Sequence, residues 1–199
     1  MTEADLHILV IDANPIRGSI IEQGLREAGH RHVTLLSDVD HLLRRIVDFD
    51  PDVVFIDLEN PNRDMLEYMF QVSRAITRPV AMFVDQSDQP SIEAAIEAGV
   101  SAYVVDGLRK DRVKPILDMA VSRFRAFDRL RRELAEAKSQ LAERKTIDRA
   151  KAILMRSKSI SEDEAYRLLR KQAMNTNRRI GQVAESLVVA AGLLADKEE

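Results

Sequence analysis

The chain has 199 residues, 45% of them hydrophobic and none of them cysteine, which allows a buried core and excludes disulfides, thiolate zinc sites and cysteine nucleophiles. Only 7 residues are glycine and 6 are proline, so the composition favours a helix-rich chain over an all-β sandwich or barrel. The net charge of −3 is unevenly divided, since residues 1–121 carry 12 Lys and Arg against 21 Asp and Glu, and residues 122–199 carry 18 against 12. The basic half is a candidate polyanion-binding unit, although a solvated helix face has the same composition.

No apolar run reaches the roughly 18–20 residues that a membrane span requires. The amino terminus lacks the basic start of a signal peptide, and the absence of cysteine fits a reducing compartment. We therefore expect a cytoplasmic protein that does not engage a membrane.

The first 121 residues alternate short apolar runs with helical patterns. The apolar runs predict five strands, at residues 8–11, 33–36, 53–56, 80–84 and 102–105. The stretches between them predict helices, one beginning after Asn14 and ending at Gly29, and others at 39–49, 65–76 and 91–98. Because these strands are almost wholly apolar, we expect a parallel sheet that is covered by helices on both faces.

Four aspartates fall at or just past the carboxyl ends of predicted strands, namely Asp12, Asp57, Asp85 and Asp106. In parallel α/β sheets the functional crevice lies at this edge, so we expect an acidic pocket there. The four histidines lie near the start of the first strand and around the second. An enzyme is therefore the least favoured class of function.

Residues 111–157 contain no glycine and one proline near the start, which predicts a single long helix. A heptad pattern places apolar residues at all five a positions and at three of the five d positions. The middle of this seam is formed by Phe127, Leu130, Leu134 and Leu141. We expect a parallel homodimeric coiled coil, because this apolar row would otherwise face water. The alternative is a single amphipathic helix packed on its own chain.

The last part of the chain predicts two further helices. Ser161 and Glu164 form a capping box at the start of the first of them. Residues 175–177 form a loop with cap-forming side chains, and residues 180–194 keep an apolar helical spacing. Together with the end of the long helix, these helices would make an all-α three-helix domain.

Residues 7–121 resemble the receiver domain of response regulators, through the motifs ILVIDAN, VVFIDLENP, VAMFVD and AYVVDG in that order. The resemblance implies a flavodoxin-like fold with a five-stranded parallel sheet. It places Asp57 at the phosphoacceptor position and Asp12 at one of the two acids that hold Mg²⁺. The second acid is replaced by Ala13, the hydroxyl residue by Val84 and the lysine by Asp106.

These replacements argue against phosphorylation of Asp57. Phosphoryl transfer requires a metal ion and a cation near the phosphoryl oxygens, whereas here one metal ligand is missing and an anion replaces the lysine. We therefore expect a pseudo-receiver with no cofactor and no catalytic residue. Two alternatives remain open: phosphorylation of Asp57, and binding of a divalent cation such as Mg²⁺ by the clustered acids without chemistry.

Residues 144–184 resemble the ANTAR output domain, which binds RNA. The matching pattern is dispersed and includes Ala150-Lys151, Leu169-Arg170 and Val183-Ala184. The order of receiver, coiled coil and ANTAR unit looks most like NasT-type antiterminators of nitrate and nitrite assimilation, with AmiR-type regulators as a close alternative. The resemblance implies a protein that binds paired hairpins with six-nucleotide loops in leader mRNA, prevents formation of a terminator, and is controlled by a nitrate- or nitrite-sensing protein. The homodimer expected from the heptad pattern would offer one RNA-binding unit to each hairpin.

The candidate RNA-binding residues are the basic, amide and aromatic side chains of this unit. They are Arg144, Arg149, Lys151, Arg156, Tyr166, Arg170, Lys171, Asn177, Arg178 and Arg179. Arginine and lysine can contact phosphates, and Tyr166 can stack on a base. The alternative for Tyr166 is a place at the edge of the core, and the alternative for Arg178 and Arg179 is a solubilising role in the loop.

The sequence thus divides into a receiver-like domain at 1–121, a coiled-coil linker helix at 122–143 and an RNA-binding domain at 144–199. An RNA-binding antiterminator is the favoured function. A DNA-binding regulator and a protein-interaction adaptor are the alternatives, although the apolar last helix is poorly suited to lie in a major groove.

Overall fold

The computed structural model describes residues 6–38, 40–106 and 108–195 of the chain. Val39, which the sequence places in a helix, lies outside the described residues. The chain forms two compact units, one through residue 128 and one from residue 129. The first unit contains the sheet, and the second is helical.

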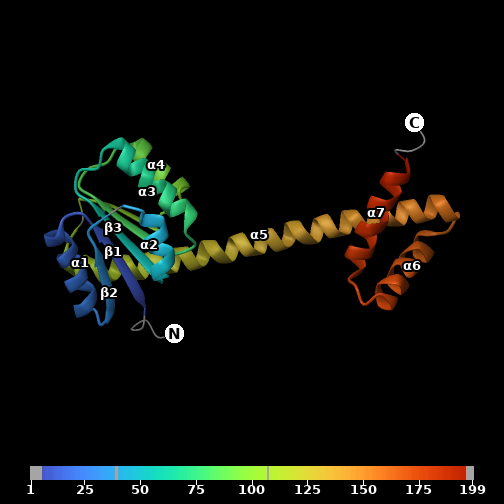
Figure 1. The fold of residues 1–199 in the computed structure, drawn as a ribbon, viewed down its shortest axis with the longest axis horizontal. Coiled ribbons are helices and arrows are strands. Elements are labelled where there is room, and N and C mark those ends of the chain that lie inside the picture. The colour runs from blue at the N-terminus through green and yellow to red at the C-terminus, as the bar shows by residue number, and fades with distance from the viewer. Residues whose placement is uncertain (1–5, 39, 107, 196–199) are drawn as a thin grey trace. The chain divides into compact units, whose positions relative to one another are not determined.

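The first unit is a five-stranded sheet enclosed by helices (Figure 1). Its strands are β1 (His7–Asp12), β2 (His32–Leu36), β3 (Val53–Leu58), β4 (Val80–Val84) and β5 (Ala102–Val105). Its helices are α1 (Pro15–Glu27), α2 (Leu42–Phe49), α3 (Arg63–Ala75) and α4 (Gln89–Glu97), together with the beginning of α5 (Lys110–Lys158). All neighbouring strands are parallel, in the order β2-β1-β3-β4-β5, so the predicted flavodoxin-like fold is confirmed.

Two apolar clusters, one on each face of the sheet, form the core of the first unit. Alternate residues of β1 divide between them: Ile8 and Val10 join the cluster with α1 and α5, whereas Leu9 and Ile11 join the cluster with α2, α3 and α4. All four residues are at most 2% exposed. A strand that is buried on both faces is apolar throughout, which explains why the sequence shows continuous apolar runs rather than alternation.

Side-chain caps set the starts of several helices. Asn14 accepts a hydrogen bond from the backbone N–H of Ile16, as the Asn-Pro sequence predicts. Helices α3 and α4 each begin two residues earlier than predicted, because Asn62 and Asp88 cap them. Gly29, with a φ of 99°, follows α1 as the predicted left-handed stop.

Helix α5 is continuous over 49 residues, in agreement with the long helix that the sequence predicts. Its first turns bury Val113 and Leu117 in the core of the first unit. Farther along, the predicted seam is open to solvent, with exposed fractions of 55–56% for Phe127, Leu130, Leu134 and Leu141. No part of the described chain therefore covers this apolar row.

The second unit packs the end of α5 against α6 (Glu162–Asn175) and α7 (Ile180–Ala195). Its small core consists of one residue of α5 and two each of α6 and α7, namely Ala150, Leu169, Ala173, Val183 and Ala184. Helix α6 begins with the predicted capping box, in which Ser161 and Glu164 exchange hydrogen bonds. None of the described helices is both long and apolar enough to span a bilayer.

Candidate functional site

The carboxyl edge of the sheet carries buried acids. Asp12 and Asp57 are register partners on the adjacent strands β1 and β3, and they are 3% and 2% exposed. The strand order makes this the switch point of the sheet, where ligands bind in open α/β folds. Asp85 directly follows β4, with its side chain 34% exposed.

The guanidinium of Arg17 lies between two of these acids. Its Nε and Nη2 donate to the two carboxylate oxygens of Asp57 at 2.8 and 2.9 Å, and its Nη1 and Nη2 donate to Asp85 at 3.1 and 2.8 Å. The hydrogen bonds to Asp57, and then those to Asp85, raise the pKa of Arg17 above its ordinary value. Because the carboxylate of Asp57 is fully buried, one side chain engages both of its oxygens away from water.

Arg17 reaches this edge because α1 approaches β1 closely. Asn14, the cap of α1, donates its own N–H to Asp12 at 2.7 Å. A Cβ atom at Gly18 would lie 3.3 Å from the Cβ of Asp12 and would also press on Leu35, so the absence of a side chain permits this approach. Sequence reasoning misses Arg17, although an arginine in the first turn after an acidic strand end is a signal that could have found it.

Asp12 stands in an environment that favours its neutral form. Its Oδ1 accepts the hydrogen bond from Asn14, while its buried Oδ2 has no hydrogen-bond partner within the described chain. Burial, with a smaller contribution from the neighbouring Asp57, raises the pKa of Asp12 to about 6. Below that pH the carboxyl of Asp12 is protonated, and its O–H can then donate toward Asp57.

This arrangement does not fit Mg²⁺. Within the part of the chain that the structure describes, no three acidic or histidine side chains are placed to hold a metal ion, and the cation between Asp57 and Asp85 is Arg17. Asp106 is exposed and, with Arg109, lines a hollow of about 490 Å³ beside Arg17. In place of the expected four-acid pocket, Arg17 bridges Asp57 and Asp85, Asp12 lies beside Asp57 on the neighbouring strand, and Asp106 lies at the rim.

We expect phosphodonors to leave Asp57 unmodified. Both of its oxygens are engaged by Arg17, and phosphoryl transfer needs an available nucleophilic oxygen and charge neutralisation by a metal. Incubation with acetyl phosphate and Mg²⁺, followed by intact-mass spectrometry, should show no added phosphate. A stoichiometric phosphate adduct that is absent from an Asp57→Asn variant would overturn this expectation. An adduct that is still present in the Asp57→Asn variant would lie on another residue and would not contradict the expectation.

The predicted RNA-binding residues lie along the second unit. Arg144, Arg149, Lys151 and Arg156 belong to α5, Tyr166, Arg170 and Lys171 belong to α6, and Asn177, Arg178 and Arg179 form the loop before α7. All of them except Lys151 are exposed. Tyr166 is 44% exposed, so it is not enclosed by the core.

Lys151 differs from the other basic residues. Its Nζ pairs with Asp148 at 2.6 Å and with Glu162 at 2.7 Å, and its side chain is 15% exposed. The hydrogen bonds with Asp148, and then with Glu162, raise the pKa of Lys151. Lys151 therefore links the end of α5 to the start of α6, and a phosphate would have to compete with two carboxylates for it.

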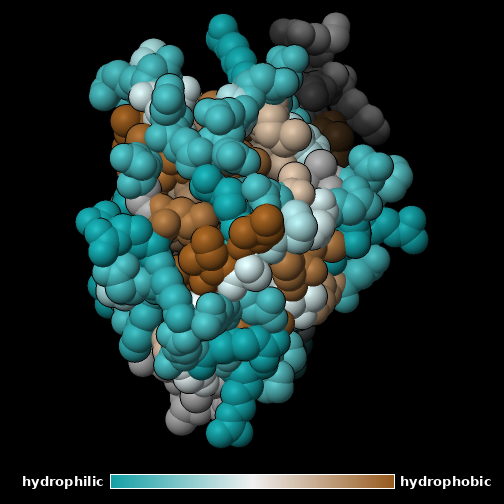
Figure 2. Space-filling view, turned by 90° about the vertical axis from the view of Figure 1, so that its left-hand side faces the viewer, coloured by the Kyte–Doolittle hydropathy of each residue, from teal (hydrophilic) through white to brown (hydrophobic). Residues whose placement is uncertain are grey.

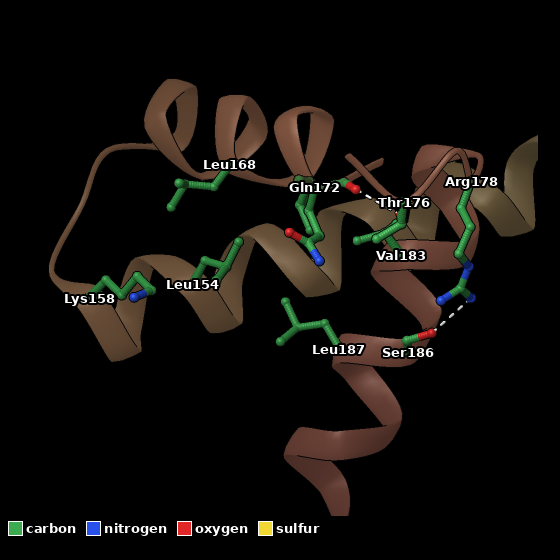
Figure 3. A pocket seen from close by; sticks show the side chains of 10 residues that line it. Leu154, Lys158, Leu168, Gln172, Thr176, Arg178, Val183, Ser186 and Leu187 are labelled. Atoms are coloured by element: carbon green, nitrogen blue, oxygen red, sulfur yellow. Dashed lines mark hydrogen bonds between the residues drawn. The ribbon is translucent and has the colours of Figure 1, made fainter. Parts of the chain in front are cut away.

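A hollow of about 420 Å³ opens between the three helices of the second unit (Figure 3). Apolar side chains from each helix form its walls, and polar side chains stand among them. The lining residues are Leu154, Lys158, Leu168, Leu169, Gln172, Thr176, Arg178, Val183, Ser186 and Leu187. Among these described lining residues, none is acidic.

Comparison with known families assigns both units. Residues 8–118, more than half of the chain, match the response regulator receiver domain. The chain belongs to the response regulator receiver family. Residues 135–188 match the ANTAR domain, so this response regulator carries an ANTAR domain after its receiver, in the order that the sequence motifs predict. The ANTAR match begins within the stretch 122–143 that the sequence assigns to the linker helix.

Relatives of this ANTAR response regulator include named regulators from three bacteria. The transcriptional regulatory protein PdtaR of Mycobacterium tuberculosis is 26% identical over 199 residues, covering 98% of this chain and 97% of PdtaR. The nitrate regulatory protein of Klebsiella oxytoca is 34% identical over 80 residues, covering 40% of this chain and 20% of that protein. The aliphatic amidase regulator of Pseudomonas aeruginosa is 25% identical over 142 residues, covering 71% of this chain and 72% of that protein.

Solved structures resemble the receiver part of the chain. A response regulator from Thermotoga maritima has a TM-score of 0.51 at 19% identity, covering 59% of this chain and 98% of that one. A CheY-like receiver domain protein from Methanospirillum hungatei has a TM-score of 0.52 at 15% identity, covering 61% and 98%. At these identities the likeness concerns the fold alone.

Proposed function

We propose that the protein is an RNA-binding transcription antiterminator, with a receiver-like domain at 1–121, a coiled-coil helix at 122–143 and an RNA-binding domain at 144–199. The observation that carries this proposal is the ANTAR match at 135–188, in the part of the chain where the exposed basic side chains lie. The similarity to proteins named as transcriptional, nitrate and amidase regulators supports it. The protein acts in the cytoplasm and has no catalytic activity.

The proposed target is a leader mRNA with two hairpins, each with a six-nucleotide loop. Exposed arginines such as Arg144 and Arg170 contact phosphates, and Tyr166 stacks on an unpaired base. Binding of both hairpins disfavours the terminator hairpin, so the polymerase continues. The resemblance to NasT-type antiterminators, and the similarity to the nitrate regulatory protein, favour genes of nitrate and nitrite assimilation.

A DNA-binding function is less well supported by the helices of the second unit. A recognition helix places polar side chains against base edges in the major groove. Helix α7 instead exposes apolar residues, among them Val189 at 58% and Leu193 at 65%. RNA therefore remains the favoured nucleic acid.

We propose that a nitrate- or nitrite-sensing protein, rather than phosphorylation, controls the antiterminator. Arg17 already pairs with the carboxylate of Asp57. The side chains of the receiver site are therefore held in place without a phosphoryl group on Asp57. The first unit also exposes apolar side chains that suit a protein partner, such as Ile16 and Val47. Figure 2 shows apolar side chains framed by hydrophilic ones on the face of this unit that lies leftmost in Figure 1.

A parallel dimer through α5 would bring two RNA-binding domains to the two hairpins. We expect the double substitution Phe127→Asp and Leu134→Asp to give monomers, because it places charges in the exposed apolar seam. Loss of the second site should weaken binding of a two-hairpin RNA by about a hundredfold. Sedimentation velocity and electrophoretic mobility shift measure the two effects.

A matched control adds the same two charges outside the seam. Ala135 and Ser139 lie on the outer face of the heptad that begins at Leu134, so the variant with Ala135→Asp and Ser139→Asp should remain dimeric and bind RNA like the natural chain. Retained dimerisation of the seam variant would contradict the proposed coiled coil.

The experiment that tests the function compares two RNAs across a range of salt concentrations. One is a two-hairpin leader RNA with hexanucleotide loops, and the other has the same stems and scrambled loops. We expect scrambling to remove most of the affinity, because base contacts depend on the loop sequence. Equal affinities that fall steeply with salt would indicate a polyanion-binding surface and would reject the antiterminator proposal.

A further inference from the structure

The hollow between α5, α6 and α7 combines apolar walls with positive charge. Its volume of about 420 Å³ is within the range of small-ligand sites. Leu154, Leu168 and Leu187, one from each helix, form its apolar walls (Figure 3). Lys158 and Arg178 add two cations, while no described lining residue carries a negative charge. The hollow therefore suits a flat apolar group that is attached to an anion.

Gln172 gives this hollow a group that can recognise hydrogen-bonding edges. Its side-chain amide lies between Leu154 and Leu187 (Figure 3). In the described part of the chain, this amide makes no hydrogen bond with another residue. A glutamine amide offers two donors and one acceptor, and such amides pair with the edges of nucleobases.

The two cations at the hollow, Lys158 and Arg178, are not paired with carboxylates of the described residues, whereas Lys151 is. Arg178 donates to the hydroxyl of Ser186 at 3.0 Å and to the backbone carbonyl of Gln182 at 3.1 Å, which orients its guanidinium without neutralising it. Lys158, at the end of α5, forms no ion pair with a carboxylate of the described residues. Lys151, in contrast, is held by two carboxylates.

We propose that this hollow receives one unstacked base of a hairpin loop, with Gln172 contacting the edge of the base and with Lys158 and Arg178 contacting adjoining phosphates. The inference rests on the proposed RNA-binding function and names the place where the loop is recognised. Sequence-specific binding of RNA loops depends on bases that leave the stack, enter apolar or aromatic surroundings and form hydrogen bonds through their edges. An apolar protein side chain would fill the apolar walls but would not engage the amide of Gln172 or the charge of Lys158.

The test uses the full chain and a two-hairpin RNA in which 2-aminopurine replaces one loop nucleotide at a time. We expect the fluorescence of one loop position to rise on binding, because that base leaves its neighbours. Gln172→Glu keeps the shape of the side chain but replaces the amide donors by a carboxylate. This variant should abolish the rise and weaken binding by about tenfold or more.

Two further variants separate recognition from folding and from net charge. Gln140→Glu makes the same chemical change on α5, at an exposed residue outside the hollow, and should bind like the natural chain. Gln172→Leu removes the hydrogen bonds without adding a charge, and should reduce the preference for the native loop over a single-base change at the position that fluoresces. Circular dichroism confirms that each variant is folded.

The outcomes distinguish the hollow from the function as a whole. Loop-specific binding that neither Gln172 variant alters would overturn the inference and leave the RNA-binding function in place. RNA binding that does not depend on the loop sequence would reject both this inference and the proposed antiterminator function. A Gln172→Glu variant that binds RNA normally but sediments differently from the natural chain would assign the hollow to a second copy of the protein, which also overturns the inference.

Discussion

Replacing Arg17 with alanine should lower the free energy of unfolding of the receiver unit by about 3–5 kcal/mol. The substitution leaves the buried carboxylate of Asp57 without its only cationic partner among the described residues, and Asp12 stands beside it. A buried charge that loses its partner retains the full cost of desolvation. Adding Asp57→Asn to Arg17→Ala should therefore recover much of the loss.

Hydrogen exchange of the amides in β1 and β3 measures this effect in the unit concerned, since a chain of two units need not unfold in one step. The matched control is Arg78→Ala, which breaks the ion pair between Arg78 and Asp50 on the surface. That pair is exposed, so its loss should cost about 1 kcal/mol or less. A similarly small effect of Arg17→Ala would show that the arginine contributes no more than a surface pair.

Removal of Arg17 should also create a response to Mg²⁺. In the natural chain the arginine holds Asp57 and Asp85, whereas Arg17→Ala leaves both carboxylates without that cation. Oxygen ligands of this kind suit Mg²⁺. Millimolar Mg²⁺ should therefore raise the melting temperature of the variant and leave that of the natural chain unchanged, and an equal response of both proteins would contradict this.

Replacing Asp12 with asparagine should stabilise the receiver unit at pH 8 by about 3 kcal/mol. In the folded protein the pKa of Asp12 is about 6, compared with 3.8 as its ordinary value. The folded state thus holds this proton more tightly, so the natural chain loses stability as pH rises from about 4 to 6 and remains less stable above pH 6. Asparagine keeps the acceptor for the N–H of Asn14 and carries no charge.

Urea unfolding between pH 4 and pH 8 tests this prediction. The stability difference between Asp12→Asn and the natural chain should be large at pH 8 and should vanish near pH 4. Asp106→Asn, which removes an exposed carboxylate at the same edge of the sheet, is the matched control. Parallel profiles of Asp12→Asn and the natural chain would show that Asp12 is charged at no cost in the folded state.

The elements of the fold follow from local sequence. Residues of β1 such as Ile8 and Val10 are apolar in succession because both faces of the sheet are covered. The stop at Gly29 and the capping box at Ser161 are visible without tertiary information. The starts of α3 and α4 are also predictable from local sequence, since Asn62 and Asp88 are residue types that commonly cap helices.

The ion pairs of the site depend on contacts that the local sequence does not specify, even though an arginine near the acidic strand end is visible in it. Arg17 lies 40 residues from Asp57 and 68 from Asp85 along the chain, so their ion pairs exist only once the strands are ordered. The sequence therefore indicates only a group of aspartates at this edge. In the structure, the positive charge of Arg17 offsets part of their negative charge. The ion pair between Lys151 and Glu162 also cannot be predicted from local sequence, because it forms only when the turn between α5 and α6 brings the two residues together.

The hold of Arg17 on Asp57 also concerns the duration of a response. The acyl phosphate of an aspartyl phosphate hydrolyses readily. In an ordinary receiver, the rate of this hydrolysis sets the lifetime of the activated state. If, as proposed, the input is a bound protein and Arg17 occupies the carboxylate of Asp57, the lifetime of each state is set by the dissociation rate of that partner. Such residence times range from milliseconds to days, and they are tuned by the interface rather than by the chemistry of the sheet edge.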